Sequence, residues 1–213
     1  FSQTRIAWNN ISIIDPLFTL PLLILIVIAG LKQKRIFAVI AILWAVFYLS
    51  LGVYQKNEAI KVSKTIAKSR GHDASRINVK PSIGNILLWK SIYETQDKFY
   101  IDAIRLGWSP KIFNGESIDK INIQSAFPWL MLKSQQAKDI KRFKWFSNGY
   151  IAINPKNKNQ IIDIRYSELP NEIGGLWGIE MSKEKGNNNH VEYITNRTMS
   201  KTRFKIFKEM LFD

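Results

Sequence analysis

The chain has 213 residues and a formal net charge of +14, and it contains no cysteine. Without cysteine, disulfides, iron-sulfur clusters and zinc sites built from thiolates are excluded, but the choice between cytoplasm and exterior stays open. The positive charge favours partners that carry negative charge, such as anionic lipid head groups, nucleic acid or acidic polymers.

The start of the chain does not resemble a signal peptide. Residues 1–10, FSQTRIAWNN, include no initiator methionine, no basic start and no small-residue cleavage site. We therefore expect a chain that begins inside a longer protein. Trp8 stands directly before an apolar run, which is where an interfacial indole is expected.

Two long apolar segments follow, at residues 11–31 and 36–54, on either side of a short basic turn. The first has no charge after Asp15 and the second has none at all. About 20 such residues are needed to cross the hydrocarbon layer of a bilayer. A pair of buried helices in a soluble core is the alternative, but core helices usually show a polar stripe, which these segments lack over most of their length. We predict an N-terminal remnant and a transmembrane helical hairpin within residues 1–54.

Asp15 and Pro16 have the pattern of a helix start, because Asp caps free N–H groups and Pro has no N–H to lose. A carboxylate at the edge of a membrane span is also a candidate functional group, so both interpretations of Asp15 stay open. Under the positive-inside bias, the basic residues of the turn favour an orientation with the turn in the cytoplasm. The basic residues beyond residue 54 favour the opposite orientation. The side of the membrane on which the rest of the chain lies is therefore left undecided.

Residues 55–72 continue with helical periodicity, and we predict an amphipathic connecting helix there. Ala59, Ile60, Ile66 and Ala67 fall on one side, lysines lie elsewhere, and Gly71 is a plausible stop. The lysines either contact phosphate head groups or face water.

Residues 73–213 are predicted to form an α+β extramembrane domain with a mainly antiparallel sheet and two or three helices. Short runs rich in Ile, Tyr, Phe and Trp alternate with Gly, Asn and Pro, which is typical of strands and turns. The expected strands are 86–93, 99–106, 149–153, 160–166, 176–182 and 191–196, with hairpin turns at 154–159 and 183–189. Helices are expected at 128–146 and 200–212, the second packed on the sheet through Phe204, Phe207 and Leu211.

Few residues form a recognisable catalytic pattern. A catalytic zinc site needs three protein ligands, and the only two histidines, His72 and His190, are far apart and outside any zinc motif. No nucleophile elbow, phosphate loop or dinucleotide motif is present. Asp163 and Arg165 stand two apart on an expected strand, which favours a structural ion pair on one face over an active site.

The order of several blocks resembles the later part of the bacterial membrane-bound metal-dependent hydrolase family, inner-membrane proteins related to YdjM. The blocks are RIAWNNISIIDPLFTLPLL, VKPSIGNILLWKSIYE, FYIDAIRLG, IKRFKWFSNGYIAI, IDIRYSELP and GLWGIEM, and together they cover nearly the whole chain. Family members begin with a segment that contains a Thr-His-Ser motif and further acidic residues, taken to bind the metal. That segment is missing from this sequence.

The resemblance implies a divalent metal, expected to be zinc, in the full-length protein and none in this chain alone. It makes Asp15 a candidate metal ligand, or a residue that hydrogen-bonds to a metal ligand. It also marks positions of unassigned role, namely Pro81, Asn85, Trp89, Asp163, Arg165, Trp177 and Gly178.

Two functions are therefore carried forward. The first is the C-terminal part of a multi-pass hydrolase of the bacterial inner membrane that acts on phosphoesters or other anionic, membrane-associated substrates, inactive as this fragment. The second is a non-enzymatic, membrane-anchored module that binds anionic lipid or an envelope polymer. Nucleic acid is not expected as a partner, since only the net charge and the aromatic residues favour it.

Overall fold

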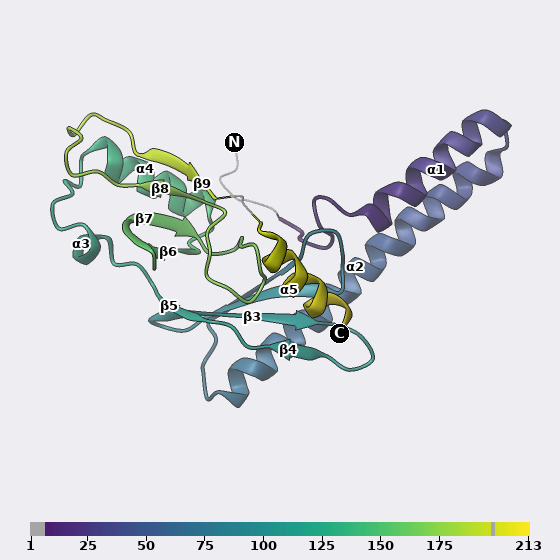
Figure 1. Cartoon of the computed structure of the whole chain (residues 1–213), viewed down its shortest axis with the longest axis horizontal. Coiled ribbons are helices and arrows are strands. Elements are labelled where there is room, and N and C mark those ends of the chain that lie inside the picture. Colours follow the sequence, from purple (N-terminus) through teal and green to yellow (C-terminus); the bar gives the residue numbers. More distant parts are fainter. Residues whose placement is uncertain (1–6, 197–198) are drawn as a thin grey trace.

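The computed structural model describes residues 7–196 and 199–213. Two helices form a hairpin that projects from an α+β body, and the body contains two antiparallel sheets (Figure 1). The hairpin helices are α1 (Pro16–Lys32) and α2 (Arg35–Ser69). The predicted α+β class with antiparallel sheets is confirmed.

Helix α1 begins where the sequence predicts, because the Asp15 side chain accepts a hydrogen bond from Phe18 N and Pro16 occupies the first turn. The capped start makes α1 only 17 residues long, shorter than the apolar segment that begins at residue 11. Among the described helices, α2 alone is long and apolar enough to cross a bilayer by length and composition.

Helix α2 runs without a break from the hairpin into the body. Its last part buries Ala59, Ile66 and Ala67, the side predicted for the connecting helix, and Gly71 at φ 71° follows its end. Ser63 of this part lies 2.7 Å from Ser91 of the sheet, hydroxyl to hydroxyl. Residues 55–69 are therefore core elements of the body as well as a connection.

The first sheet lies between α2 and the rest of the body. It contains β1 (Arg76–Pro81), β2 (Leu88–Glu94), β3 (Lys98–Arg105), β4 (Lys111–Phe113) and β5 (Ser117–Asp119), with β1-β2-β3-β4 in order and β5 also paired with β3. Side chains alternate between the two faces of a strand. In β2, Trp89 and Tyr93 cluster with α2 residues, whereas Leu88 and Ile92 point to the opposite face.

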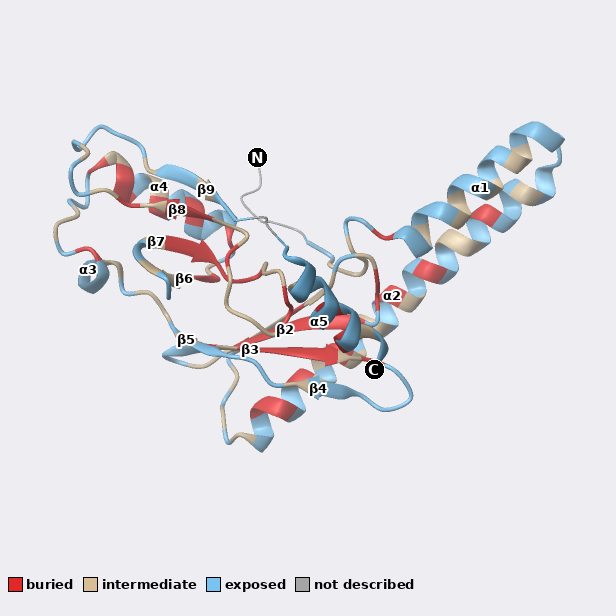
Figure 2. Ribbon diagram, in the orientation of Figure 1, coloured by how far each residue is buried: buried red, intermediate tan, exposed pale blue. Residues whose placement is uncertain are grey.

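The second sheet packs against that opposite face. It contains β6 (Ile151–Asn154), β7 (Asn157–Asp163), β8 (Trp177–Glu180) and β9 (Glu192–Thr195), in that order. Ile162 and Ala152 meet Ile92 and Ile101 of the first sheet, and α4 (Gln135–Phe146) covers the other face through Ile140 and Phe143. Figure 2 shows that burial is concentrated in these layers, while most of the hairpin is exposed.

Helix α5 (Lys201–Phe212) packs on the first sheet, as predicted, beside Leu88 and Ala103. The packing residues differ in part from the prediction. Phe207 and Met210 are buried, whereas Phe204 is about half exposed because it faces away from the sheet.

All six predicted strands are present with shifted ends, and both predicted hairpin turns join the strands expected. The sequence did not indicate β1, the three-residue strands β4 and β5, or the short helix α3 (Ile123–Ala126). The helix expected from residue 128 begins at Gln135 instead, because Ser134 caps it.

Candidate functional site

Asp15 lies at the point where the chain enters the hairpin, and it is 2% exposed. Both of its carboxylate oxygens accept from the Tyr48 hydroxyl at 2.9 Å, and one also accepts from Phe18 N at 3.3 Å. The carboxylate therefore caps α1 and links it to α2. This geometry favours the helix-cap interpretation, and the role as a metal ligand stays a prediction.

The block that contains Pro81, Asn85 and Trp89 forms a tight loop between β1 and β2. Pro81 ends β1 in register with Trp89. The Asn85 side chain is 4% exposed, accepts from Leu87 N and Leu88 N at 2.9 and 2.7 Å, and donates to Ile83 O. Trp89 is fully buried and donates from its indole to Ile86 O at 2.8 Å. These residues shape the loop rather than offering free chemical groups.

This loop and the chain before α1 are side by side. Gly84 N donates to Ile14 O at 2.9 Å and lies 3.3 Å from Ser12 Oγ. We call the region formed by residues 8–15, residues 82–87 and Tyr48 the hairpin base. Two blocks that are about 70 residues apart in the sequence meet there.

Lysines from the body fix the chain that leads into the hairpin base. Lys80 Nζ lies 3.0 Å from Asn9 Oδ1, and Lys56 donates to Asn10 Oδ1 and to the Trp8 carbonyl. Both cations hold polar backbone or amide oxygens of a segment that has no regular secondary structure. The direction in which the chain approaches α1 is thereby set.

Lys80 also begins a continuous polar and aromatic path to the second sheet. Its ammonium group lies 2.7 Å from the Tyr166 hydroxyl, and the Tyr166 ring lies 4.3 Å from the Trp177 ring. The Trp177 indole N–H donates to Asp163 Oδ2 at 3.4 Å. The hairpin base is thus connected to residues of the later blocks of the chain.

Asp163 and Arg165 form the structural ion pair that the sequence predicts. The carboxylate is fully buried, the closest N–O distance is 2.6 Å, and Arg165 stands just beyond the end of β7 rather than on it. Burial opposes the charge of Arg165, but its hydrogen bond to Asp163 outweighs this and raises the pKa of the guanidinium. With both oxygens occupied, Asp163 is not poised as a general base.

Gly178 has a packing role. It lies in β8 opposite Ile162, and a Cβ at this position would lie 2.5 Å from the Ile161 carbonyl oxygen. Only glycine permits this close approach of the two strands.

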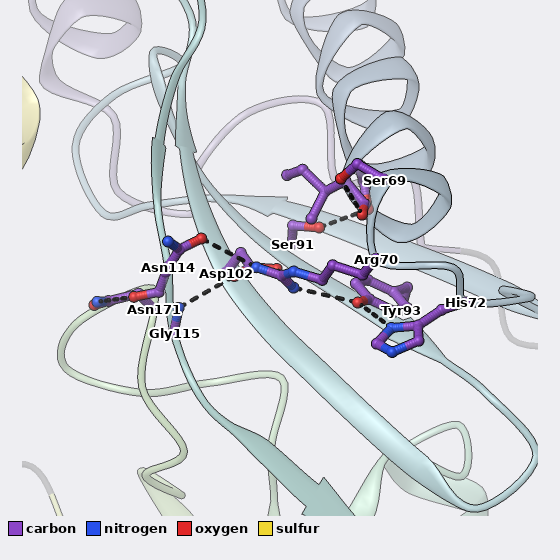
Figure 3. Close-up of polar contacts among 11 residues, drawn as sticks. Ser69, Arg70, His72, Ser91, Tyr93, Asp102, Asn114, Gly115 and Asn171 are labelled. Atoms are coloured by element: carbon purple, nitrogen blue, oxygen red, sulfur yellow. Dashed lines mark hydrogen bonds and ion pairs between the residues drawn. The ribbon is translucent and has the colours of Figure 1, made fainter.

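Sequence reasoning missed a network at the C-terminal end of α2 (Figure 3). Arg70 donates to both oxygens of Asp102 at 2.7 and 2.8 Å, and to the Tyr93 hydroxyl at 3.2 Å. His72 Nδ1 lies 2.8 Å from the same hydroxyl. The hydrogen bond to Asp102 raises the pKa of Arg70. A bidentate arginine-carboxylate pair is strong and directional, so this network fixes α2 on the sheet.

Lys90 is a second feature that the sequence did not reveal, because it stands inside an apolar strand pattern. It is buried, and its ammonium group donates to Ser167 Oγ and to the Glu172 carbonyl, both at 2.7 Å. Burial lowers the pKa of Lys90 to about 7. Lys90 thus ties the first sheet to the segment between β7 and β8.

No group of three or more His, Asp or Glu side chains that could hold a metal occurs within residues 7–196 and 199–213. His190 pairs with Asp139 at 2.9 Å, far in the sequence from His72. The resemblance places the metal ligands in a segment outside this sequence, so the expected metal of the full-length protein stays a prediction. Comparisons with protein-family models, with curated proteins and with solved structures found no match for the chain.

Proposed function

We propose that this chain belongs to an integral membrane protein whose α1–α2 hairpin lies in the bilayer and whose body rests at the surface. The observation that carries the proposal is the exposure of the hairpin. No residue of α1 is buried, and most of the hairpin is exposed (Figure 2). Its exposed residues include large apolar ones on both helices, such as Leu23, Val27 and Phe47. Contiguous apolar surface of this size on a soluble monomer would be unusual, and lipid is the solvent that suits it.

At a finer level, we propose that the chain is the C-terminal part of a membrane-bound metal-dependent hydrolase of the bacterial inner membrane. The resemblance of the sequence blocks supports this, as does the meeting of two of those blocks at the hairpin base. The described residues that lead into α1, from Trp8 to Asp15, lie at this same base, and in the longer polypeptide they would follow the expected metal-binding chain. The net charge of +14 suits phosphoesters or other anionic, membrane-associated substrates. The metal ligands would come from that preceding chain, and no chemical step is assigned to the residues described.

The test uses the longer polypeptide that includes the residues before Phe1, purified in detergent and returned to vesicles. Metal content is measured by mass spectrometry, and hydrolysis is followed with a membrane-soluble phosphoester. We expect a bound divalent metal and hydrolysis that stops on chelation and returns when the metal is restored. A polypeptide without metal, or hydrolysis that chelation leaves unchanged, would exclude the hydrolase.

The alternative is a non-enzymatic module that binds anionic lipid or an envelope polymer. It is favoured by the net charge of +14, which attracts anionic lipid or polymer. Its mark is binding of an added anionic polymer or soluble anionic lipid head group by the vesicle-inserted protein, with an affinity that falls steeply with salt, and no metal in the longer polypeptide. An inserted protein that binds neither of these anionic ligands would exclude it.

A further inference from the structure

Helix α1 is short for the layer it is proposed to cross. Its 17 residues rise about 25 Å, whereas the hydrocarbon layer is about 30 Å thick. With the basic turn after α1 at the far head groups, roughly 5 Å of hydrocarbon remains at the hairpin base. The residues beside the N-terminus of α1 must therefore contact this remaining part of the hydrocarbon layer.

The side chains that lie there are apolar and exposed. Ile13 and Ile14, just before the helix, are 96% and 63% exposed. In the loop of residues 82–87, Ile83 is 57% exposed and Leu87 is 39% exposed. The hydrogen bond from Gly84 N to Ile14 O places this loop at the level of the start of α1. Residues 82–87 carry no charge.

The backbone of the loop is suited to a medium with little water. Non-helical backbone is tolerated near lipid only where its polar groups find partners within the protein. Here Ser82 N donates to Leu88 O, and Leu87 O accepts from Leu106 N, both at 2.8 Å. The Asn85 side chain bonds to three further backbone groups of the loop and the start of β2.

The loop is also held firmly in its conformation. Gly84 has a φ of +77°, which a residue with a Cβ rarely adopts, and a Cβ built there would lie 3.7 Å from Pro16 Cδ. The side chain of Ile86 is buried in the same apolar cluster as Tyr48 of α2. The loop is therefore a rigid part of the hairpin base and not a mobile surface loop.

We infer that the loop of residues 82–87 inserts Ile83 and Leu87 into the bilayer beside the hairpin. Together with Ile13 and Ile14 it supplies the apolar length that α1 lacks. The partner of this surface is the acyl-chain boundary of the lipid, because the surface continues the exposed apolar face of the hairpin. The inference rests on the proposed insertion of the hairpin and adds a second contact, made by the body.

Because the chain has no cysteine, single cysteines can be placed on an unaltered background. The three positions are Ile83→Cys in the loop, Val27→Cys on the exposed surface of α1, and Lys158→Cys at the exposed start of β7 as the matched control. Each protein is labelled with bimane and reconstituted into vesicles with and without brominated lipids. Circular dichroism checks that each variant is folded.

We expect bromine on the upper acyl chain to quench bimane at position 83 several-fold more than at position 158. Position 27 should be quenched by bromine placed deeper in the acyl chain. Quenching at position 27 with none at position 83 would overturn the inference but leave the proposed insertion of the hairpin intact. The bilayer would then be expected to thin around α1. No quenching at 27 would overturn the proposed insertion itself.

Discussion

Replacing Asp15 separates its two interpretations most clearly. In Asp15→Ala, α1 loses its cap, at a cost of about 1 kcal/mol. The buried Tyr48 hydroxyl also loses the acceptors that it has at 2.9 Å, which costs a further 1–3 kcal/mol or so. Asp15→Asn keeps an oxygen in the same place and caps helices equally well, but it lacks the charge of a metal-binding carboxylate.

Thermal unfolding in detergent micelles, followed by tryptophan fluorescence, measures the difference. For a chain of this size each kcal/mol corresponds to roughly 2–4 °C in Tm. If Asp15 acts as a cap and a link to Tyr48, the Ala variant should melt about 4–16 °C below wild type, from these costs combined. The Asn variant should stay close to wild type.

Two results would refute this reasoning. One is an Ala variant as stable as wild type, which would mean that the link to Tyr48 contributes nothing. The other is an Asn variant that is as unstable as the Ala variant, or that loses metal from the longer polypeptide. Either behaviour of Asn would show that the charge of Asp15 matters, as expected of a ligand.

Three further predictions concern the body. Arg70→Ala removes the guanidinium from the buried Asp102 carboxylate, which keeps the Gly115 N–H as a donor, and should lower the free energy of unfolding in denaturant by about 3 kcal/mol. As a control, Lys185→Ala breaks an exposed ion pair and should lower it by less than about 1 kcal/mol. Equal losses in the two variants would contradict the role of the network. Burial lowers the pKa of Lys90 from 10.5 to about 7, so between these values the unfolded chain holds a proton that the folded chain does not, and stability rises with pH by up to about 1.4 kcal/mol per unit. Lys90→Met should flatten this rise in Tm measured from pH 7 to 10, and an unchanged slope would assign it to other groups. Gly178→Ala places a methyl group against the backbone of the neighbouring strand and should lower the free energy of unfolding by about 1–3 kcal/mol. An unchanged stability would show that β8 can shift away from β7 without cost.

Strong local patterns in the sequence predicted most of the fold. The Asp15–Pro16 start, the stop at Gly71 and the six expected strands each combine a clear apolar period with turn or cap residues, and the structure confirms them. The strands β4 and β5 are three residues long and at the edge of the sheet, so they carry too little apolar pattern to be seen. The start of α4 was placed early because capping by Ser134 outweighed the apolar run before it.

The site was less predictable, because its geometry depends on contacts between distant parts of the chain. The pair of Asp163 and Arg165 is local and was predicted, whereas the pair of Arg70 and Asp102 joins positions 32 residues apart and gave no signal. Lys90 is buried within β2, and its partners Ser167 and Glu172 lie about 80 residues further along the chain, so the sequence gave no indication of its environment. Pro81, Asn85 and Trp89 were marked only through resemblance, and the structure shows how they build a loop against α1.

The central claim is that the hairpin lies in lipid, and its most direct test is flotation. The chain is synthesised in the presence of neutral vesicles, washed with alkaline carbonate, and centrifuged through a density gradient. The exposed apolar faces of α1 and α2 predict that it floats with the vesicles after the wash. A chain that stays at the bottom as a monomer, without detergent, would contradict the account.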